Sequence, residues 1–375
     1  MAQRILVSVT SDMVTDQRVN RMASTLKEAG HRVLVIARAL KTSAELSPKR
    51  YRTIRFRLWF EKGPLFYLTF NLRLFWFLLW HHADILVAND LDTLLPNYLV
   101  SRIKRIPLVY DSHEYFTGVP ELEGRPKVKK MWKAIEKFCL PGLKHCITVN
   151  QSIADLYDNE YGTAFQIIRN VPEVSMPFMA EKQDLRVRLN LPTDKKIVIL
   201  QGAGINIQRG AEEAVEAMKY LDNVVLLIVG GGDVIDNLKQ QVVESGLAEK
   251  VIFVAKQPVL SLRKYTASAD LGITLDKDTN INYRFSLPNK LFDYIQAGIP
   301  ILASNLPEVR RVVEAYQVGR ISEDHSPKNI AKHIDEMLND SEANAQWKIN
   351  LEKASKELNW EKEKEKLLRI FRAID

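Results

Sequence analysis

Short runs of apolar residues alternate with helical patterns along almost the whole chain. These runs are apolar at every position, which is typical of parallel strands that helices cover on both faces. In the first half they predict strands at 5–9, 33–37, 85–88, 107–110 and 146–149, and helices at 17–29, 65–80, 92–104, 127–140 and 152–161. This alternation predicts a doubly wound, Rossmann-like α/β domain.

The alternation pauses at 169–178, where Pro172 and Pro177 disfavour a helix interior and a central strand. A second series follows, with strands predicted at 197–200, 224–229, 251–254, 271–274 and 300–303, and helices at 209–219, 233–245, 287–297 and 306–315. Near the end of the chain, Leu367 and Phe371 lie on one side of a charged helix, as in a surface helix that docks on a core. We therefore expect two domains and a final helix, at 1–172, 173–355 and 356–375.

The composition is that of a globular protein. Of 375 residues, 46% are hydrophobic and 26% are charged, and only Cys139 and Cys146 are cysteines. Two cysteines exclude a disulfide scaffold and favour a reducing compartment, and the first residues lack the pattern of a signal peptide, so we expect a cytoplasmic location. A helix over the apolar run 65–80 would be about 24 Å long, shorter than the roughly 30 Å core of a bilayer, so no membrane span is expected.

Positive charge is concentrated in the first half. Residues 1–170 hold 25 Lys and Arg against 16 Asp and Glu, whereas the rest of the chain holds 28 and 30. The excess lies largely in the segment 49–57 and in a cluster made of Arg125, Lys127, Lys129, Lys130, Lys133 and Lys137. Such a field attracts an anionic membrane or substrate, and the alternative is a solvated basic surface. Nucleic acid is not an expected partner, because no binding motif accompanies the charge.

Polar residues directly follow the predicted strands of the first half. Ligands of open parallel sheets collect beyond the carboxyl ends of the strands. The first such group contains Asp12, Asp16 and Arg18, although Asp16 also fits the N-cap of the following helix. Asp90 and Asp92 follow the third predicted strand.

The fourth predicted strand is followed by a histidine between two carboxylates. Asp111, His113 and Glu114 stand together at its carboxyl end. An imidazole in this position can donate a hydrogen bond or exchange a proton near neutral pH, so we predict a functional His113.

The second half contains two loops suited to phosphate. The first holds Gly202, Gly204 and Arg209, but Ile207 stands where a dinucleotide fingerprint would need a third glycine. Flexible glycines, a helix N-terminus and a fixed cation suit a diphosphate. The second loop runs into a helix near Leu287, with Lys290 and Asp293 on one helical face; its candidate donor contacts are Ser286, Leu287, Pro288, Asn289, Lys290 and Asp293.

These motifs resemble the family-4 retaining glycosyltransferases of the GT-B fold. The resemblance lies in the branch that reads S-D-x-x-x-D-Q-R near the start, Y-D-S-H-E in the middle and L-P-N-K-x-x-D/E-Y-x-x-x-G-x-P late, in the same order and spacing. It implies that two Rossmann-like domains face each other across a cleft. The first domain would hold the acceptor and the second a nucleotide-activated sugar, and the final helix would return to the first domain.

The resemblance also implies roles for single residues. Asp293 matches the second glutamate of the E-x7-E motif, which binds the donor ribose, whereas Phe285 replaces the first, sugar-binding glutamate. Asn282 and Ser286 are the candidates to take over that sugar contact. Arg209 matches the pyrophosphate lysine; its partner arginine is absent, and Lys290 is expected to supply that charge. His113 matches the active-site histidine, which would lie close to the transferred sugar.

The expected function is sugar transfer from a UDP- or GDP-linked donor. Retention of configuration is implied, with a hydroxyl of a glycan or lipid-linked acceptor of cell-envelope or glycoconjugate synthesis as the attacking group. No metal and no cofactor are expected, since Arg209 and Lys290 can stabilise the leaving diphosphate. His113, Arg209 and Lys290 are the predicted catalytic residues, and the acceptor side is predicted to hold Asp12, Asp16, Arg18, Asp90 and Glu114. The alternatives are a nucleotide-sugar epimerase or hydrolase and a non-catalytic sugar-nucleotide or membrane-binding protein.

Overall fold

The computed structural model describes residues 2–174 and 181–374 and divides into two compact units. The first unit comprises the described residues up to 170 together with those from 361 onward, and the second comprises the described residues in between. The predicted junction at 169–178 falls at this division, although its residues 175–178 lie outside the described residues.

The first unit is a parallel sheet of seven strands in the order β3-β2-β1-β4-β5-β6-β7. Its strands are β1 (Arg4–Ser8), β2 (Arg32–Ala39), β3 (Arg52–Arg57), β4 (Ile85–Asn89), β5 (Leu108–Ser112), β6 (His145–Thr148) and β7 (Gln166–Ile167). Its helices are α1 (Gln17–Glu28), α2 (Gly63–Trp80), α3 (Leu91–Lys104), α4 (Pro126–Cys139), α5 (Gln151–Tyr161) and α15 (Trp360–Arg372), with short 3-10 turns η1 (Phe116–Gly118), η2 (Pro120–Leu122) and η3 (Leu140–Gly142).

The second unit is a parallel sheet of six strands in the order β10-β9-β8-β11-β12-β13. Its strands are β8 (Lys196–Gly202), β9 (Val224–Gly230), β10 (Val251–Val254), β11 (Leu271–Thr274), β12 (Ile301–Ser304) and β13 (Gly319–Ser322). Its helices are α6 (Lys182–Arg188), α7 (Ala211–Ala217), α8 (Ile235–Glu244), α9 (Val259–Ser268), α10 (Ile281–Arg284), α11 (Asn289–Ala297), α12 (Pro307–Tyr316), α13 (Pro327–Asn339) and α14 (Ser341–Glu357), with η4 (Met218–Tyr220).

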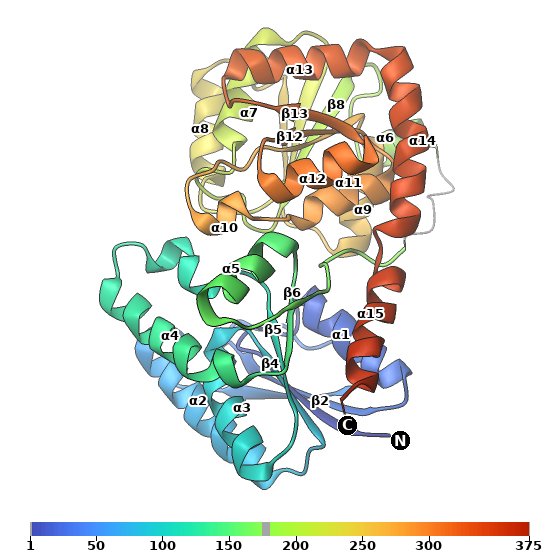
Figure 1. The fold of residues 1–375 in the computed structure, drawn as a ribbon. Coiled ribbons are helices and arrows are strands. Elements are labelled where there is room, and N and C mark those ends of the chain that lie inside the picture. Colours follow the sequence, from blue (N-terminus) through green and yellow to red (C-terminus); the bar gives the residue numbers. More distant parts are fainter. Residues whose placement is uncertain (1, 175–180, 375) are drawn as a thin grey trace. The chain divides into compact units, whose positions relative to one another are not determined.

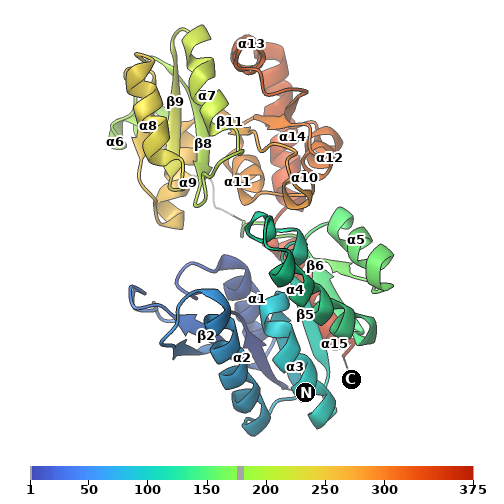
Figure 2. The same cartoon turned by 90° about the vertical axis from the view of Figure 1, so that its left-hand side faces the viewer.

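Helices cover both faces of each sheet, as the apolar strands require. In the first unit α2, α3 and α4 lie side by side over one face, and α1 and α15 lie over the other (Figures 1 and 2). In the second unit α7 contacts both α8 and α13 on one face, whereas α11 contacts α9 and α14 on the other. Strands β4, β5 and β12 are buried at every position, so the prediction of sheets buried on both faces is confirmed. No helix within the described residues is both long enough and apolar enough to cross a membrane.

Several elements differ from the sequence prediction. The basic segment 49–57 contains the edge strand β3, in which arginines interrupt the apolar pattern. The edge strands β7 and β13 and the helices α6, α9, α10, α13 and α14 are also additional. Short or exposed elements such as β13 and α9 bury too few positions to show a clear period, whereas α13 buries Ile330, Ile334 and Met337 on one face and has a helical period that the prediction overlooked. The final helix begins at Trp360, since residues 356–357 still belong to α14.

The final helix packs on the first unit through one apolar face. Leu367, Ile370 and Phe371 are buried, and the Glu363 carboxylate accepts a hydrogen bond of 3.0 Å from the backbone N–H of Arg169. The side of the helix that carries Arg369 is exposed. An amphipathic helix therefore closes the core of the first unit from the far end of the chain.

We expect Leu367→Ala to destabilise the first unit by about 3 kcal/mol, because removal of a fully buried leucine side chain leaves a cavity. Urea unfolding followed by circular dichroism should show the transition at a lower urea concentration than in the wild type. Arg369→Ala, an exposed change in the same helix, is the matched control. Equal midpoints for the two variants would contradict this packing.

Candidate functional site

The strand order of each sheet reverses between two neighbouring strands, and loops meet at that point. In the first unit the reversal lies between β1 and β4, which pair in parallel. In the second unit it lies between β8 and β11. The carboxyl ends of strands at such a reversal form the usual ligand crevice of open α/β sheets. Most of the predicted site residues follow these strands or the strands next to them.

In the first unit His113 lies between two carboxylates. Its ring is 23% exposed, with Nδ1 3.1 Å from Oδ2 of Asp90 and Nε2 3.4 Å from Oδ2 of Asp111. The backbone N–H of His113 also donates to Oδ1 of Asp90, at 2.9 Å. The structure therefore brings together three residues that the sequence places in two separate segments.

These carboxylates control the charge of the imidazole. Burial lowers the pKa of His113, but Asp90 and Asp111 outweigh burial and hold the pKa well above its ordinary value. The two carboxylates therefore favour the imidazolium form of His113. In that state it donates hydrogen bonds and does not accept a proton.

Asp111 is itself fixed by a buried ion pair with Arg18. Arg18 is 4% exposed, and its Nε and Nη2 donate to the two carboxylate oxygens of Asp111 at 3.0 and 2.6 Å. Burial would raise the pKa of Asp111, but Arg18 and then His113 outweigh it and lower the pKa to about 2. Arg18, predicted for the acceptor side, is buried, so it supports the site by holding Asp111.

Asp90 has an unusual backbone conformation. Its φ of 58° and ψ of 165° fall in a region that glycine almost alone adopts. The backbone N–H of Asp90 donates to the carbonyl of Asp111 at 2.9 Å, and its side chain turns to His113. Strain of this kind persists where the surroundings over-determine the conformation, and here it directs a carboxylate at the imidazole.

Asp92 is a second carboxylate at the same edge. It is 7% exposed and accepts a hydrogen bond from the hydroxyl of Thr10, across the reversal between β1 and β4. Burial, and next the nearby charge of Asp90, raise the pKa of Asp92 to about 7. Its other oxygen, Oδ1, has no hydrogen-bond partner among the described residues. Asp92 therefore changes its charge near neutral pH.

The remaining first-unit candidates lie in different surroundings. Asp16 is the N-cap of α1, where it accepts from the backbone N–H of Val19, so its structural interpretation is confirmed. Asp12 pairs with Arg55 at 3.4 Å and accepts from Ser43, and so anchors the loop after β2. The side chain of Glu114 is exposed.

Glycines bring the ends of two neighbouring strands of the second unit close together. Strand β8 ends at Gly202 and the loop after it contains Gly204, whereas β9 ends at Gly230, which pairs with Gly202. A Cβ at Gly230 would overlap the carbonyl oxygen of Gly202, and its φ of 145° also requires glycine. The loop after β8 ends at Gly210, so α7 begins at Ala211 and Arg209 stays in the loop.

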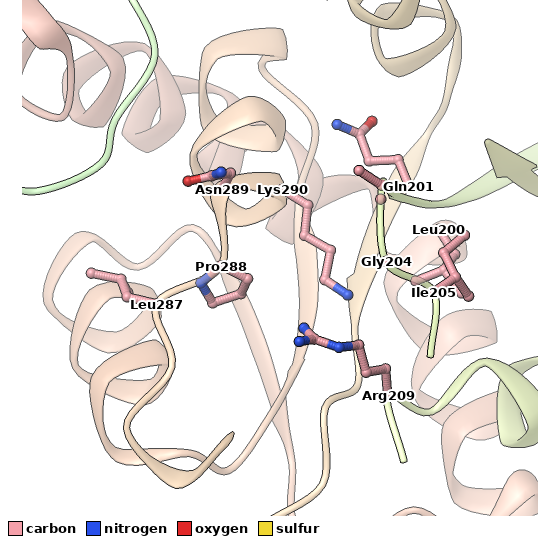
Figure 3. A pocket seen from close by; sticks show the side chains of 11 residues that line it. Leu200, Gln201, Gly204, Ile205, Arg209, Leu287, Pro288, Asn289 and Lys290 are labelled. Carbon is pink, nitrogen blue, oxygen red and sulfur yellow. The ribbon is translucent and has the colours of Figure 1, made fainter. Parts of the chain in front are cut away.

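Arg209 and Lys290 line one cavity of about 300 Å³, together with Gly202, Gly204, Leu287, Pro288 and Asn289 (Figure 3). The two cationic side chains extend toward one another in this view. Pro288 is the N-cap residue of α11, which begins at Asn289, two residues later than the helix predicted from the sequence. The structure thus joins two basic residues that lie 81 positions apart in the sequence.

A buried carboxylate that sequence analysis missed lies between these cations. Asp276 is 1% exposed, and its oxygens are 3.4 Å from Nη1 of Arg209 and 3.4 Å from Nζ of Lys290. With Asp278 it forms an Asp-x-Asp pair just after β11, a signal that could have identified it. Asp278 instead pairs with the exposed Arg284. No group of three or more His, Cys, Asp or Glu among the described residues could hold a metal ion.

Lys290 is shielded from water at this site. It is 10% exposed, and burial lowers its pKa, an effect that Asp276 opposes and Arg209 reinforces. Arg209 also stacks on the ring of Tyr283 from α10, 4.7 Å from its centroid. The cavity therefore holds two positioned cations in a partly dry environment, where charge interactions are strong.

Asp293 and the sugar-contact candidates lie nearby in the sequence but differ in their contacts. Asp293 accepts a hydrogen bond of 2.9 Å from Gln201 on β8, and Gln201 accepts in turn from Thr266 at 2.6 Å. Gln201, which lines the cavity, was also missed by sequence analysis. Asn282 is 7% exposed, and Ser286 has a buried hydroxyl without a hydrogen-bond partner among the described residues.

Two family models match separate parts of the chain. The model described as Glycosyltransferase Family 4 matches residues 16–172, and that described as Glycosyl transferases group 1 matches residues 181–354. Together they span most of both units.

The chain is also similar to individual proteins. It is 26% identical over 163 residues to an uncharacterized glycosyltransferase of Methanocaldococcus jannaschii, covering 43% of this chain and 40% of that protein. It is 24% identical over 221 residues to the chitobiosyldiphosphodolichol beta-mannosyltransferase of Candida albicans, covering 53% of this chain and 46% of that protein. The chain thus spans less than half the length of either relative.

Solved structures show the same fold over nearly the whole length. Sucrose-phosphate synthase from Thermosynechococcus elongatus has a TM-score of 0.81 at 19% identity, covering 99% of this chain and 98% of that one. HepE from Anabaena, solved in complex with UDP-glucose, has a TM-score of 0.76 at 16% identity, covering 99% and 100%. The two Rossmann-like sheets are those of the GT-B fold, as predicted.

We expect Asp90→Asn to lower the pKa of His113 by about one to three pH units, because one of its two nearby carboxylates is neutralised. NMR titration of the histidine ring signals measures this value directly. Asp12→Asn, which removes a carboxylate that contacts Arg55 and Ser43, is the control and should leave the His113 titration unchanged. An unaltered midpoint in Asp90→Asn would show that Asp90 does not control the imidazole.

Proposed function

Because the chain belongs to the group 1, family 4 glycosyltransferases, we propose that it transfers a sugar from a nucleotide-activated donor to an acceptor hydroxyl. The observation that carries this proposal is the cavity in which Arg209 and Lys290 approach one another. The proposed leaving group is the diphosphate of a UDP- or GDP-linked sugar. The structural neighbour HepE was solved with UDP-glucose, which supports a donor of this class.

The cavity suits the charge that develops in this reaction. Cleavage of a sugar–phosphate bond adds negative charge to the diphosphate, and positioned cations stabilise that charge most where little water is present. We propose that Arg209 and Lys290 supply this stabilisation without a metal ion. The N-terminus of α11, which begins at Asn289, adds backbone N–H groups near the same anion.

Other residues near the cavity have proposed donor contacts. Asp293, held by Gln201, is the proposed acceptor of hydrogen bonds from the ribose hydroxyls. Ser286 is the favoured replacement for the missing sugar-binding glutamate, because its buried hydroxyl has no partner within the described residues. Phe285 cannot form such a polar contact.

The first unit is the proposed acceptor domain. Both ring nitrogens of His113 face carboxylates, so its proposed role is that of a positive charge beside the transferred sugar, and it would not act as the base that activates the acceptor. In a retaining transfer the departing phosphate oxygen is the proposed proton acceptor. Asp92, with a pKa raised to about 7, is a further group that can hold or release a proton at this edge of the sheet.

A lipid-linked acceptor is supported by the surface of α2. One stripe of this helix, containing Phe66, Phe70, Leu74 and Leu78, is buried. A second stripe is about half or more exposed: Leu65, Leu68, Leu72, Trp76 and Trp80. The relative from Candida albicans is named for a dolichol-linked diphosphate acceptor.

Exposed positive charge on the same sheet face as α2 (Figures 1 and 2) fits an anionic membrane. On and just before α4, the exposed basic residues are Arg125, Lys127, Lys129, Lys130 and Lys137. Lys133 of the predicted basic cluster is instead engaged with Glu160 at 2.5 Å. Apolar side chains beside exposed lysines are typical of a surface that rests on anionic lipid, and we propose peripheral membrane contact here.

Arg209→Ala and Lys290→Ala are each expected to lower turnover roughly 100-fold, equivalent to about 2.7 kcal/mol of transition-state stabilisation. A thermal-stability screen of nucleotide sugars identifies the donor, and release of its nucleoside diphosphate with candidate acceptors measures turnover. Arg310→Ala removes an ion-paired cation of the same unit outside the cavity and serves as the control. Wild-type rates in both cavity variants would refute their roles. Equal release of nucleoside diphosphate with and without acceptor would favour a hydrolase, conversion of the donor into an epimeric nucleotide sugar an epimerase, and an unchanged donor with every acceptor a binding protein.

We expect Trp76→Ser with Trp80→Ser to weaken binding to anionic liposomes roughly tenfold or more, because two exposed indole rings no longer enter the interface. Sedimentation with vesicles of phosphatidylglycerol and phosphatidylcholine measures the bound fraction. Leu260→Ser, at a 73% exposed apolar position of the second unit, is the control. Binding that ignores salt, anionic lipid and both tryptophans would refute the membrane proposal.

A further inference from the structure

The most unusual group in the second unit is the buried carboxylate of Asp276. It lies two residues beyond the end of β11, at the reversal of strand order, where the loop after the neighbouring β8 carries Arg209. One oxygen of Asp276 faces Arg209 and the other faces Lys290, each at 3.4 Å. Asp276 thus bridges the two cations of the cavity.

Both contacts are long for hydrogen bonds between charged groups, which are usually about 2.7–2.9 Å. Asp276 is therefore positioned to balance charge without holding either cation tightly. With no anion bound, Arg209 and Lys290 would repel each other, and burial would favour the neutral form of Lys290. A carboxylate between them opposes both effects, because it attracts Arg209 and Lys290 and favours the charged form of Lys290.

We propose that Asp276 is the counter-anion of the empty donor site and that it favours release of the nucleoside diphosphate product. This role rests on the proposed function of the cavity. The diphosphate that enters would share both cations with Asp276, whose own negative charge would then weaken the attraction. Asp276 is in this sense a positioning residue, since it acts on the donor through Arg209 and Lys290.

The repulsion between the Asp276 carboxylate and a bound diphosphate should be weaker for the donor than for the product. A diphosphate linked to a sugar carries about two negative charges, whereas the free nucleoside diphosphate carries about three near neutral pH, since its terminal phosphate ionises there. A fixed anion therefore disfavours the product more than the donor. The same two cations can then stabilise the leaving group during transfer and still release it afterwards.

The test is the affinity of Asp276→Asn for free anions. Isothermal titration with UDP, GDP, UDP-glucose and GDP-mannose should show roughly tenfold tighter binding of the nucleoside diphosphate than in the wild type, the size of effect that one nearby charge has on an ionic equilibrium. The increase in affinity for the matching nucleotide sugar should be smaller. In turnover, kcat and the donor KM should both fall, because product leaves more slowly.

Asp278→Asn is the matched control, because it makes the same chemical change two residues away at a carboxylate that pairs with the exposed Arg284. It should bind all four ligands as the wild type does. If Asp276 had only a structural role, Asp276→Asn would bind the nucleoside diphosphate more weakly than the wild type, because damage to the site weakens binding. Unchanged or weaker product binding in a folded Asp276→Asn variant overturns the proposal.

The outcomes also separate this proposal from the proposed function. If the wild type binds none of the four ligands, the donor site is refuted, and the role of Asp276 with it. If the wild type binds and Asp276→Asn gains nothing, only the role of Asp276 is refuted. Thermal unfolding checks the fold, and Asp276→Ser removes the same charge if the asparagine variant does not fold. Failure of both to fold, with Asp278→Asn folded, would assign Asp276 a structural role and overturn the proposal.

Discussion

Burial of both faces of each parallel sheet is the constraint on which the candidate site depends. Strands such as β4 and β12 are covered by helices and carry no exposed face on which polar groups could gather. Charged side chains that serve a ligand therefore lie near the strand ends, in the last residues of a strand, in the loops and in the first turns of helices. At the two reversals of strand order these loops come together, and the polar groups of each unit converge there.

In each unit, a buried carboxylate at this edge of the sheet pairs with basic side chains. In the first unit Arg18 holds Asp111 in a close, two-point ion pair, and Asp111 in turn helps to keep His113 charged. In the second unit Asp276 bridges Arg209 and Lys290 through longer contacts. A close pair fixes geometry, whereas a loose one leaves its cations available to a stronger anion. The two pairings therefore suit different tasks, orientation in one unit and reversible binding in the other.

The fold could be predicted from sequence as far as burial leaves a periodic pattern. The central strands are apolar over most of their length, and each was placed within a few residues of its observed position. The edge strand β3 was missed because three of its six residues are arginines and only Phe56 is buried, so no apolar run marks it. The helix α14 was missed for a related reason, since only Trp347, Leu351 and Ala354 of its residues are buried. An element with few buried residues has few apolar positions, so its period is hard to recognise in the sequence.

The sequence by itself determined which residues lie beyond the strand ends and at the start of helices, and so identified His113, Arg209 and Lys290 as candidates. Only the tertiary structure decided what each of them contacts. Asp276 and Arg209 are 67 positions apart, and Arg18 and Asp111 are 93 apart, so no local spacing indicates their pairing. The charge of a buried group depends on such distant partners, because burial removes the water that would otherwise screen it.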